Sequence, residues 1–181
     1  MSLRALWLVL ALWGAVHPMY WFVTYLAGNG WDFGAMIDAR RSGAAEALAQ
    51  EGTVDVCVSI SCLEHIDDLA EATQAMARIS TQDTLHLHIV NFSNHLSKAS
   101  PFEPLYEAPY ERFVERWGRQ INGLRFSDVD RLFKDAGLPV TSIPLDRRAD
   151  ALPGVIDRSW SERYDREELA IRTALLATPT G

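Results

Sequence analysis

Residues 54–68 constrain the fold more than any other part of the chain, because they specify a strand, a sharp turn and the start of a helix. Apolar residues alternate with small or polar ones from Val54 to Ser61, which is the two-residue period of a β-strand. The small residues of the second face are typical of a strand covered on both faces. The pattern therefore predicts an interior strand, followed by a helix over residues 69–80 that Asp67 or Asp68 caps with its carboxylate.

The same residues resemble a known family. Asp55-x-Val-x-Ser-x-Ser-x-Leu-Glu-His-Ile-Asp-Asp68 is similar to the fourth-strand motif of class I S-adenosylmethionine-dependent methyltransferases, particularly the small-molecule branch known as methyltransferase type 11. Leu63-Glu64-His65-Ile66 is the most specific part of the motif. Taken alone, these four residues also fit a simpler interpretation, in which Leu63 and Ile66 are core contacts while Glu64 and His65 are solvated or bonded to nearby backbone.

The resemblance covers residues 52–181 and implies an α/β fold, namely a partial Rossmann-like methyltransferase sheet of strands four to seven with their helices. It implies methyl transfer from the cofactor S-adenosylmethionine to a small-molecule acceptor. The residues expected along the methionine side of the cofactor are Ser61, Cys62, Leu63, Glu64 and His65. Asn91 and His95 are expected to face the acceptor.

His95 is the candidate catalytic residue, because it follows a strand and imidazole titrates near neutral pH. A loop histidine that only caps backbone groups is the alternative. The preceding strand is predicted over residues 84–91, with His86 and His88 on one covered face. Local spacing gives these two histidines no third ligand, so the sequence predicts no metal site.

The rest of the C-terminal half follows the family's order of elements. A helix capped by Ser127 is predicted to end at Gly137, and an edge strand follows over residues 138–146. The second half of residues 167–177 is predicted to be the last, antiparallel strand, after a solvated helix start that carries Glu167 and Glu168. The aromatic segment before these elements either lines a pocket or packs through Tyr106, Tyr110 and Trp117.

The N-terminal residues have a different composition. Residues 5–26 contain no formally charged side chain, and this length suffices for one membrane crossing. We therefore predict an N-terminal hydrophobic segment over residues 1–38, a linker over 39–51, and a methyltransferase-like domain over 52–181. The first segment also resembles the opening span of small bacterial multi-span membrane proteins of unknown function, through Leu8-Val-Leu-Ala-Leu, His17-Pro-Met-Tyr and Asn29-Gly-Trp-Asp-Phe-Gly-Ala-Met.

A membrane anchor implies a membrane-associated protein with its C-terminal domain in the cytoplasm, and without an anchor the protein is expected to be cytoplasmic. A cleaved signal peptide is the rival interpretation of the same residues, although no small-x-small cleavage site follows cleanly before His17.

The first three strands of the family have no room between the hydrophobic segment and Val54. Gly28-Asn-Gly-Trp-Asp-Phe-Gly34 lacks the preceding acid and the following helix and strand of a cofactor loop. The chain therefore looks truncated, and its activity is left open. The alternatives are a non-enzymatic membrane-anchored fragment or fusion product, and an enzyme completed by a separate chain that supplies the missing strands.

The net charge of the chain argues against a nucleic-acid partner, and the positions of its two cysteines argue against a disulfide. The formal net charge is −7, whereas a nucleic-acid partner requires a basic surface. We therefore expect no nucleic-acid binding. Cys57 and Cys62 flank the key turn and are expected to stay reduced, because a strand end and the adjoining turn rarely meet disulfide geometry.

Overall fold

The computed structural model describes residues 54–95, 99–118 and 121–179. The predicted membrane segment, the linker and the glycine run at residues 28–34 lie outside the described residues, so these predictions stay open. Within the described part of the chain, no helix is both long enough and apolar enough to cross a membrane.

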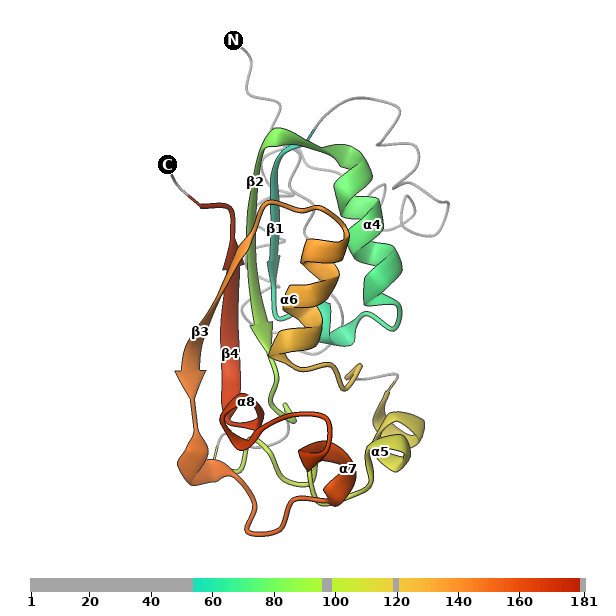
Figure 1. The fold of residues 1–181 in the computed structure, drawn as a ribbon, viewed down its shortest axis with the longest axis vertical. Helices are drawn as coiled ribbons and strands as arrows, with labels where there is room; N and C mark the ends of the chain where they lie inside the picture. The colour runs from blue at the N-terminus through green and yellow to red at the C-terminus, as the bar shows by residue number, and fades with distance from the viewer. Residues whose placement is uncertain (1–53, 96–98, 119–120, 180–181) are drawn as a thin grey trace, which may run out of the picture.

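Four strands form one mixed sheet in the order β1-β2-β4-β3 (Figure 1). The strands are β1 (Val54–Ile60), β2 (Ser80–Asn91), β3 (Thr141–Arg147) and β4 (Ile171–Ala177). β1 and β2 are parallel, whereas β4 pairs antiparallel with both β2 and β3. The mixed sheet with its helices confirms the α/β prediction, including an antiparallel last strand and an edge position for the strand that carries Pro144.

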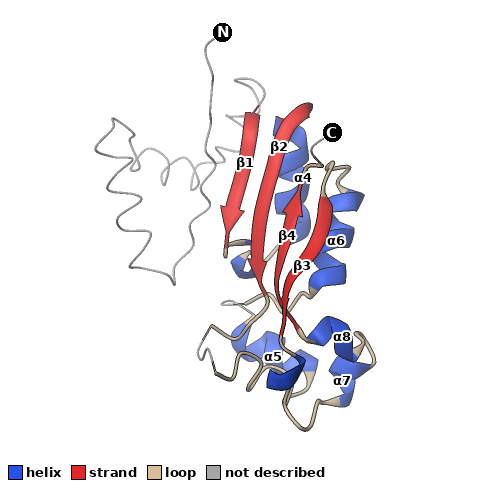
Figure 2. Cartoon of the chain, turned by 90° about the vertical axis from the view of Figure 1, so that its left-hand side faces the viewer, coloured by secondary structure: helices blue, strands red, loops and turns tan. Residues whose placement is uncertain are grey.

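Two helices cover one face of this sheet (Figure 2). They are α4 (Leu69–Ile79) and α6 (Phe126–Asp135). Leu69 and Met76 of α4 and Val129 and Phe133 of α6 are buried in one core cluster with residues of the sheet. The two helices belong to the two crossovers of the sheet, and burial of their apolar stripes fixes them against it.

Local capping explains where the helices begin and end. Asp68 caps α4, since its carboxylate accepts a hydrogen bond from the backbone N–H of Glu71 at 2.9 Å. The predicted cap of α6 is wrong: the helix begins at Phe126 with Arg125 as N-cap, so Ser127 lies inside the first turn. Gly137 follows α6 with φ +73°, a left-handed conformation that suits glycine and ends the helix as predicted.

A second cluster lies beyond the ends of β1 and β2, where short helices gather (Figure 2). The elements are α5 (Tyr110–Trp117), α7 (Arg158–Ser161), α8 (Arg166–Leu169) and the 3-10 turn η2 (Ala149–Ala151). Fully buried Trp160 packs its ring against Tyr106, Tyr110, Phe113 and Tyr164. Tyr106 is also fully buried, and Tyr110 and Trp117 pack against the cluster, so the aromatic segment serves packing.

The second face of the sheet is apolar and exposed among the described residues. Ile60, Leu85, Leu87, Ile143 and Leu145 have exposed fractions between 44% and 65%. The register aligns Val58 with Leu87 and Ile143 with Leu175, so the exposed residues form rows across the sheet. β1 pairs only with β2 in the described part of the chain, which differs from the interior position that its sequence predicts.

Candidate functional site

The turn after β1 places a short 3-10 helix, η1 (Leu63–His65), at the carboxyl end of the parallel pair β1 and β2. Ser61 has φ +47°, and its N–H donates to the carbonyl of Ile89 at 2.8 Å. The turn therefore stays attached to β2 while the chain changes direction. Cys62 and Leu63 are fully buried, which leaves their side chains unavailable to a ligand and limits any contact with one to their backbone.

Glu64 is the least ordinary residue of this turn, because its carboxyl group is buried without hydrogen bonds. Its exposed fraction is 2%, and neither carboxyl oxygen has a hydrogen-bond partner of normal geometry. Burial raises the pKa of Glu64 to about 8, although nearby backbone N–H groups and the positive charge of Arg125 oppose the rise. Glu64 is therefore mostly protonated at pH 7.

His95 reaches the same carboxyl group from the loop after β2. Its backbone has φ +58°, its Nε2 lies 3.6 Å from Oε1 of Glu64, and its side chain is 28% exposed. The rings of His65 and His95 have their centroids 4.8 Å apart. Burial, and to a lesser degree the charge of His65, lowers the pKa of His95. A neutral acid and a neutral imidazole thus face each other at one edge of the sheet.

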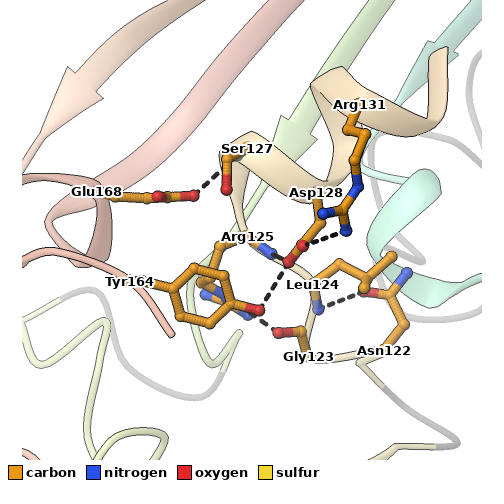
Figure 3. A network of polar contacts seen from close by, with 9 residues as sticks. All are labelled: Asn122, Gly123, Leu124, Arg125, Ser127, Asp128, Arg131, Tyr164 and Glu168. Carbon is orange, nitrogen blue, oxygen red and sulfur yellow. Dashed lines mark hydrogen bonds and ion pairs between the residues drawn. The ribbon is translucent and has the colours of Figure 1, made fainter. Parts of the chain in front are cut away.

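Asn122 holds this turn from a segment far along the chain. Its Nδ2 donates to the carbonyls of Leu63 at 2.8 Å and Ile66 at 3.1 Å, and its backbone N–H donates to the carbonyl of Glu64 at 2.8 Å. Its Oδ1 accepts from the N–H of Leu124 at 3.1 Å (Figure 3). These bonds tie the carbonyls of Leu63, Glu64 and Ile66 to one distant residue, and so they fix the position of Glu64.

Arg125 connects the segment that holds the turn, around Asn122, to the second cluster around Trp160. The sequence alone predicted no role for it. Its guanidinium is 1% exposed and donates to the carbonyls of Phe92 at 2.8 Å and Gly123 at 3.3 Å and to the hydroxyl of Tyr106 at 3.1 Å. It also lies over the rings of Phe92, Tyr106 and Trp160. Nη2 alone lacks a hydrogen-bond partner.

The polar network continues from Arg125 into the first turn of α6 (Figure 3). Asp128 accepts from the backbone N–H of Arg125 at 3.1 Å and from the Tyr164 hydroxyl at 2.7 Å. Glu168 accepts from the backbone N–H of Ser127 at 2.8 Å. Glu167 is exposed as predicted, but Glu168 is half-buried and bonded, so the two residues differ in role.

The structure brings together three of the candidate site residues: Glu64 and His65 from the motif, and His95 from the loop after β2. Polar atoms of Glu64, His65 and His95 all lie within 4.8 Å of one another. Asn91 lies at the end of β2, but its Oδ1 accepts from the backbone N–H of Ser93 at 3.0 Å, so it shapes the loop that carries His95. The sequence placed Glu64, His65 and His95 in one candidate site, and these residues lie close together in the structure, whereas the contacts of Asn122 and Arg125 were not predicted.

A second group of ligand-type side chains lies inside the sheet. His86 and His88 are buried on the covered face of β2, as predicted. The register places Cys57 of β1 opposite His86, and the ligand atoms of all three residues lie within 4.8 Å of one another. No disulfide joins Cys57 to Cys62, since both remain thiols in the structure.

Comparison with known proteins gives distant structural likenesses. No family model matches the chain, and no curated protein matches it. An O-methyltransferase family protein from Burkholderia thailandensis superposes with a TM-score of 0.40 and 15% identity, covering 76% of this chain and 33% of its own. Phosphoethanolamine N-methyltransferase 2 of Haemonchus contortus, in complex with S-adenosyl-L-methionine, superposes with a TM-score of 0.40 and 13% identity, covering 70% and 34%.

The chain thus spans about a third of the length of these two methyltransferases.

Proposed function

We propose that residues 52–181 form the C-terminal half of an S-adenosylmethionine-dependent methyltransferase site that acts on a small molecule. The motif from Asp55 to Asp68 suggests the family. The observation that carries the proposal is the contact between Glu64 and His95 at the carboxyl edge of the parallel pair β1 and β2, where open α/β sheets bind their ligands.

The described residues fit one end of the cofactor. Two buried carboxyl oxygens without hydrogen bonds are expensive in a folded protein, and a ligand with donor groups would satisfy them. The glycine loop and the ribose carboxylate have no counterpart among the described residues. We therefore propose that other strands complete the site, supplied by a separate chain.

Each side chain has a role in the proposed reaction. Bound S-adenosylmethionine would supply an activated methyl group. His95 is held neutral by its burial, so it is suited to accept the proton that the acceptor loses on methylation. Glu64 lies 3.6 Å from Nε2 of His95 and would stabilise the resulting imidazolium in the fraction of molecules in which its carboxyl group has already lost its proton to solvent. Ser61 and His65 would lie along the cofactor, and Cys62 and Leu63 would contribute backbone contacts.

A hybrid protein tests this proposal. Residues 52–181, joined behind the first half of a related methyltransferase, are expected to bind S-adenosylmethionine measurably by calorimetry. The full-length chain alone should bind it weakly, since each missing hydrogen bond to a charged group removes roughly 1.5–3 kcal/mol. Replacing Glu64 and His65 together by alanine should weaken binding by the hybrid about tenfold or more, which corresponds to about 1.4 kcal/mol.

The matched control replaces Glu115 and Glu167, which are both exposed, by alanine. Equal affinity of the two double variants for the cofactor would show that the turn after β1 does not contact it. A folded hybrid without any affinity would contradict the proposed function as a whole.

We also propose that the chain is attached to membranes through residues 5–26, with residues 52–181 in the cytoplasm. A helix over this uncharged run would satisfy its own backbone hydrogen bonds in hydrocarbon. The protein should therefore stay in the membrane pellet after an alkaline carbonate wash. A variant with Ala15 and Val16 replaced by arginine should be released, since each charge costs roughly 2.5–3.5 kcal/mol at the centre of a membrane helix. Release of the unsubstituted full-length protein would contradict the anchor.

A further inference from the structure

We propose that Cys57, His86 and His88 bind one thiophilic metal ion, such as Cu⁺ or Zn²⁺, between β1 and β2. All three side chains are nearly or fully buried, with exposed fractions of 2%, 2% and 0%. Their ligand atoms lie within 4.8 Å of one another. A thiolate and two imidazoles are a donor set that such ions prefer.

The sheet register explains why the three donors meet. Cys57 is opposite His86 in the parallel pair β1 and β2, and Ser59 is opposite His88. Because side chains alternate along a strand, His86 and His88 point to the same covered face. The third ligand is therefore 29 residues before the first histidine in sequence (86 − 57 = 29) but directly beside it in the sheet.

The distance between the two imidazoles fits coordination to one ion. Nδ1 of His86 lies 3.4 Å from Nε2 of His88. Two nitrogens bound tetrahedrally at about 2.0–2.1 Å from one zinc ion are separated by about 3.3 Å. The facing nitrogens therefore need almost no movement to share an ion, and the Cys57 sulfur lies within 4.8 Å of both.

Serine hydroxyls hold the outer nitrogens of both rings. The Ser80 hydroxyl donates to the carbonyl of Met76 at 2.7 Å, so its oxygen must accept from Nε2 of His86, which lies 3.2 Å away. This bond places the proton of His86 on Nε2 and leaves Nδ1 with a lone pair directed at the centre of the group. Such outer hydrogen bonds orient the histidine ligands of metal sites.

His88 completes the same arrangement through Ser59. The Oγ of Ser59 lies 2.8 Å from Nδ1 of His88. In the metal-bound form, Nδ1–H donates to Ser59, and Nε2 presents its lone pair to the ion. In the metal-free form, Nε2–H donates to Nδ1 of His86 instead. Binding thus moves one proton on His88 and rotates one hydroxyl, and it releases the thiol proton of Cys57 to solvent.

The charge of the three donor groups favours one kind of ion. Among the described residues, no carboxylate belongs to this group. One thiolate balances a monovalent ion fully but leaves a divalent ion with one uncompensated positive charge, which is costly in a protein interior. Cu⁺ is therefore the better match. Ser80, whose hydroxyl accepts from Nε2 of His86, also lines an open cavity of about 390 Å³ between the ends of α4 and α6, so the group lies one side chain away from this cavity.

Metal titration of the purified full-length chain tests this proposal. Under anaerobic conditions the protein should withdraw one equivalent of Cu⁺ from a colorimetric chelator. In a separate experiment, Co²⁺ as a spectroscopic substitute for Zn²⁺ should give a thiolate-to-cobalt charge-transfer band. Cys57→Ala should abolish the band and weaken binding of either ion at least tenfold. Cys62→Ala, which removes the other buried thiol, should retain both.

Each outcome decides the proposal. Binding of either ion that depends on Cys57 but not on Cys62 supports the site. Absence of binding by the unsubstituted chain, or equal effects of the two cysteine variants, would overturn it. His88→Gln provides a second check if Cys57→Ala fails to fold, since circular dichroism reports folding independently of the metal.

Discussion

Replacing Arg125 by lysine is expected to lower the free energy of unfolding by roughly 3–5 kcal/mol. Replacing it by methionine should cause a loss that is no larger. Arg125 donates to two carbonyls and a hydroxyl in three different segments. Each such bond to a charged group contributes about 1.5–3 kcal/mol. Lysine keeps the cost of burying a charge but lacks the planar fork that reaches all three acceptors.

Methionine differs from lysine because it removes the buried charge together with its bonds. The relief of desolvation offsets part of the loss, so we expect a destabilisation of about 2–4 kcal/mol. Urea unfolding followed by circular dichroism measures both variants. Arg131→Met is the matched control: its side chain is 67% exposed, and it should change stability by less than about 0.5 kcal/mol. A lysine variant as stable as the unsubstituted protein would contradict this account of Arg125.

The protein is also expected to lose stability between pH 6.5 and pH 8.5, and Glu64→Gln should remove this loss. The pKa of Glu64 is raised from 4.5 to about 8, so in this window the folded state binds a proton that the unfolded state has already released. Stability therefore falls as the pH rises, with a slope of up to about 1.4 kcal/mol per pH unit, and levels off above pH 8. The expected loss is on the order of 2 kcal/mol.

Comparison with the Glu64→Gln variant separates Glu64 from the other titrating groups. Burial lowers the pKa of His86, His88 and His95 from 6.5, so these groups raise stability as the pH rises through 6.5 and partly oppose the loss at the lower end of the window, equally in both proteins. Burial raises the pKa of Cys57 from 9.0 to about 11, so its contribution lies mostly at higher pH. Urea unfolding at pH 6.5, 7.5 and 8.5 measures the effect, with exposed Glu167→Gln as control. Parallel profiles for the Glu64→Gln variant and the unsubstituted protein would show that Glu64 does not titrate in this window.

Local patterns predicted the elements of the fold well. The alternation from Val54 to Ser61 and the acid at Asp68 specify a strand and a capped helix with little help from the rest of the chain. The last strand is different, because the propensity of residues 167–177 favours a helix. The order of elements in the resembling family correctly predicted β4 there, since pairing with two neighbouring strands outweighs local propensity.

The candidate site was predicted only in outline for a physical reason. Sequence places Glu64, His65 and His95 at the carboxyl ends of neighbouring strands. The burial of Glu64, however, depends on bonds that Asn122 makes across 56 to 59 positions of sequence. Likewise, the proximity of Cys57 to His86 depends on strand register. Contacts of this range leave no periodic signal in a single sequence.

The position of β4 has a consequence for how the protein is made. Residues 171–177 form the last of the described strands in sequence order, yet they lie between β2 and β3 in the sheet. Until they are synthesised, β3 has no partner strand and β2 is paired on one side only among the described elements. The described sheet therefore closes only after residue 177 has been made, and a stop codon at or before codon 171 would remove a central strand instead of an edge strand.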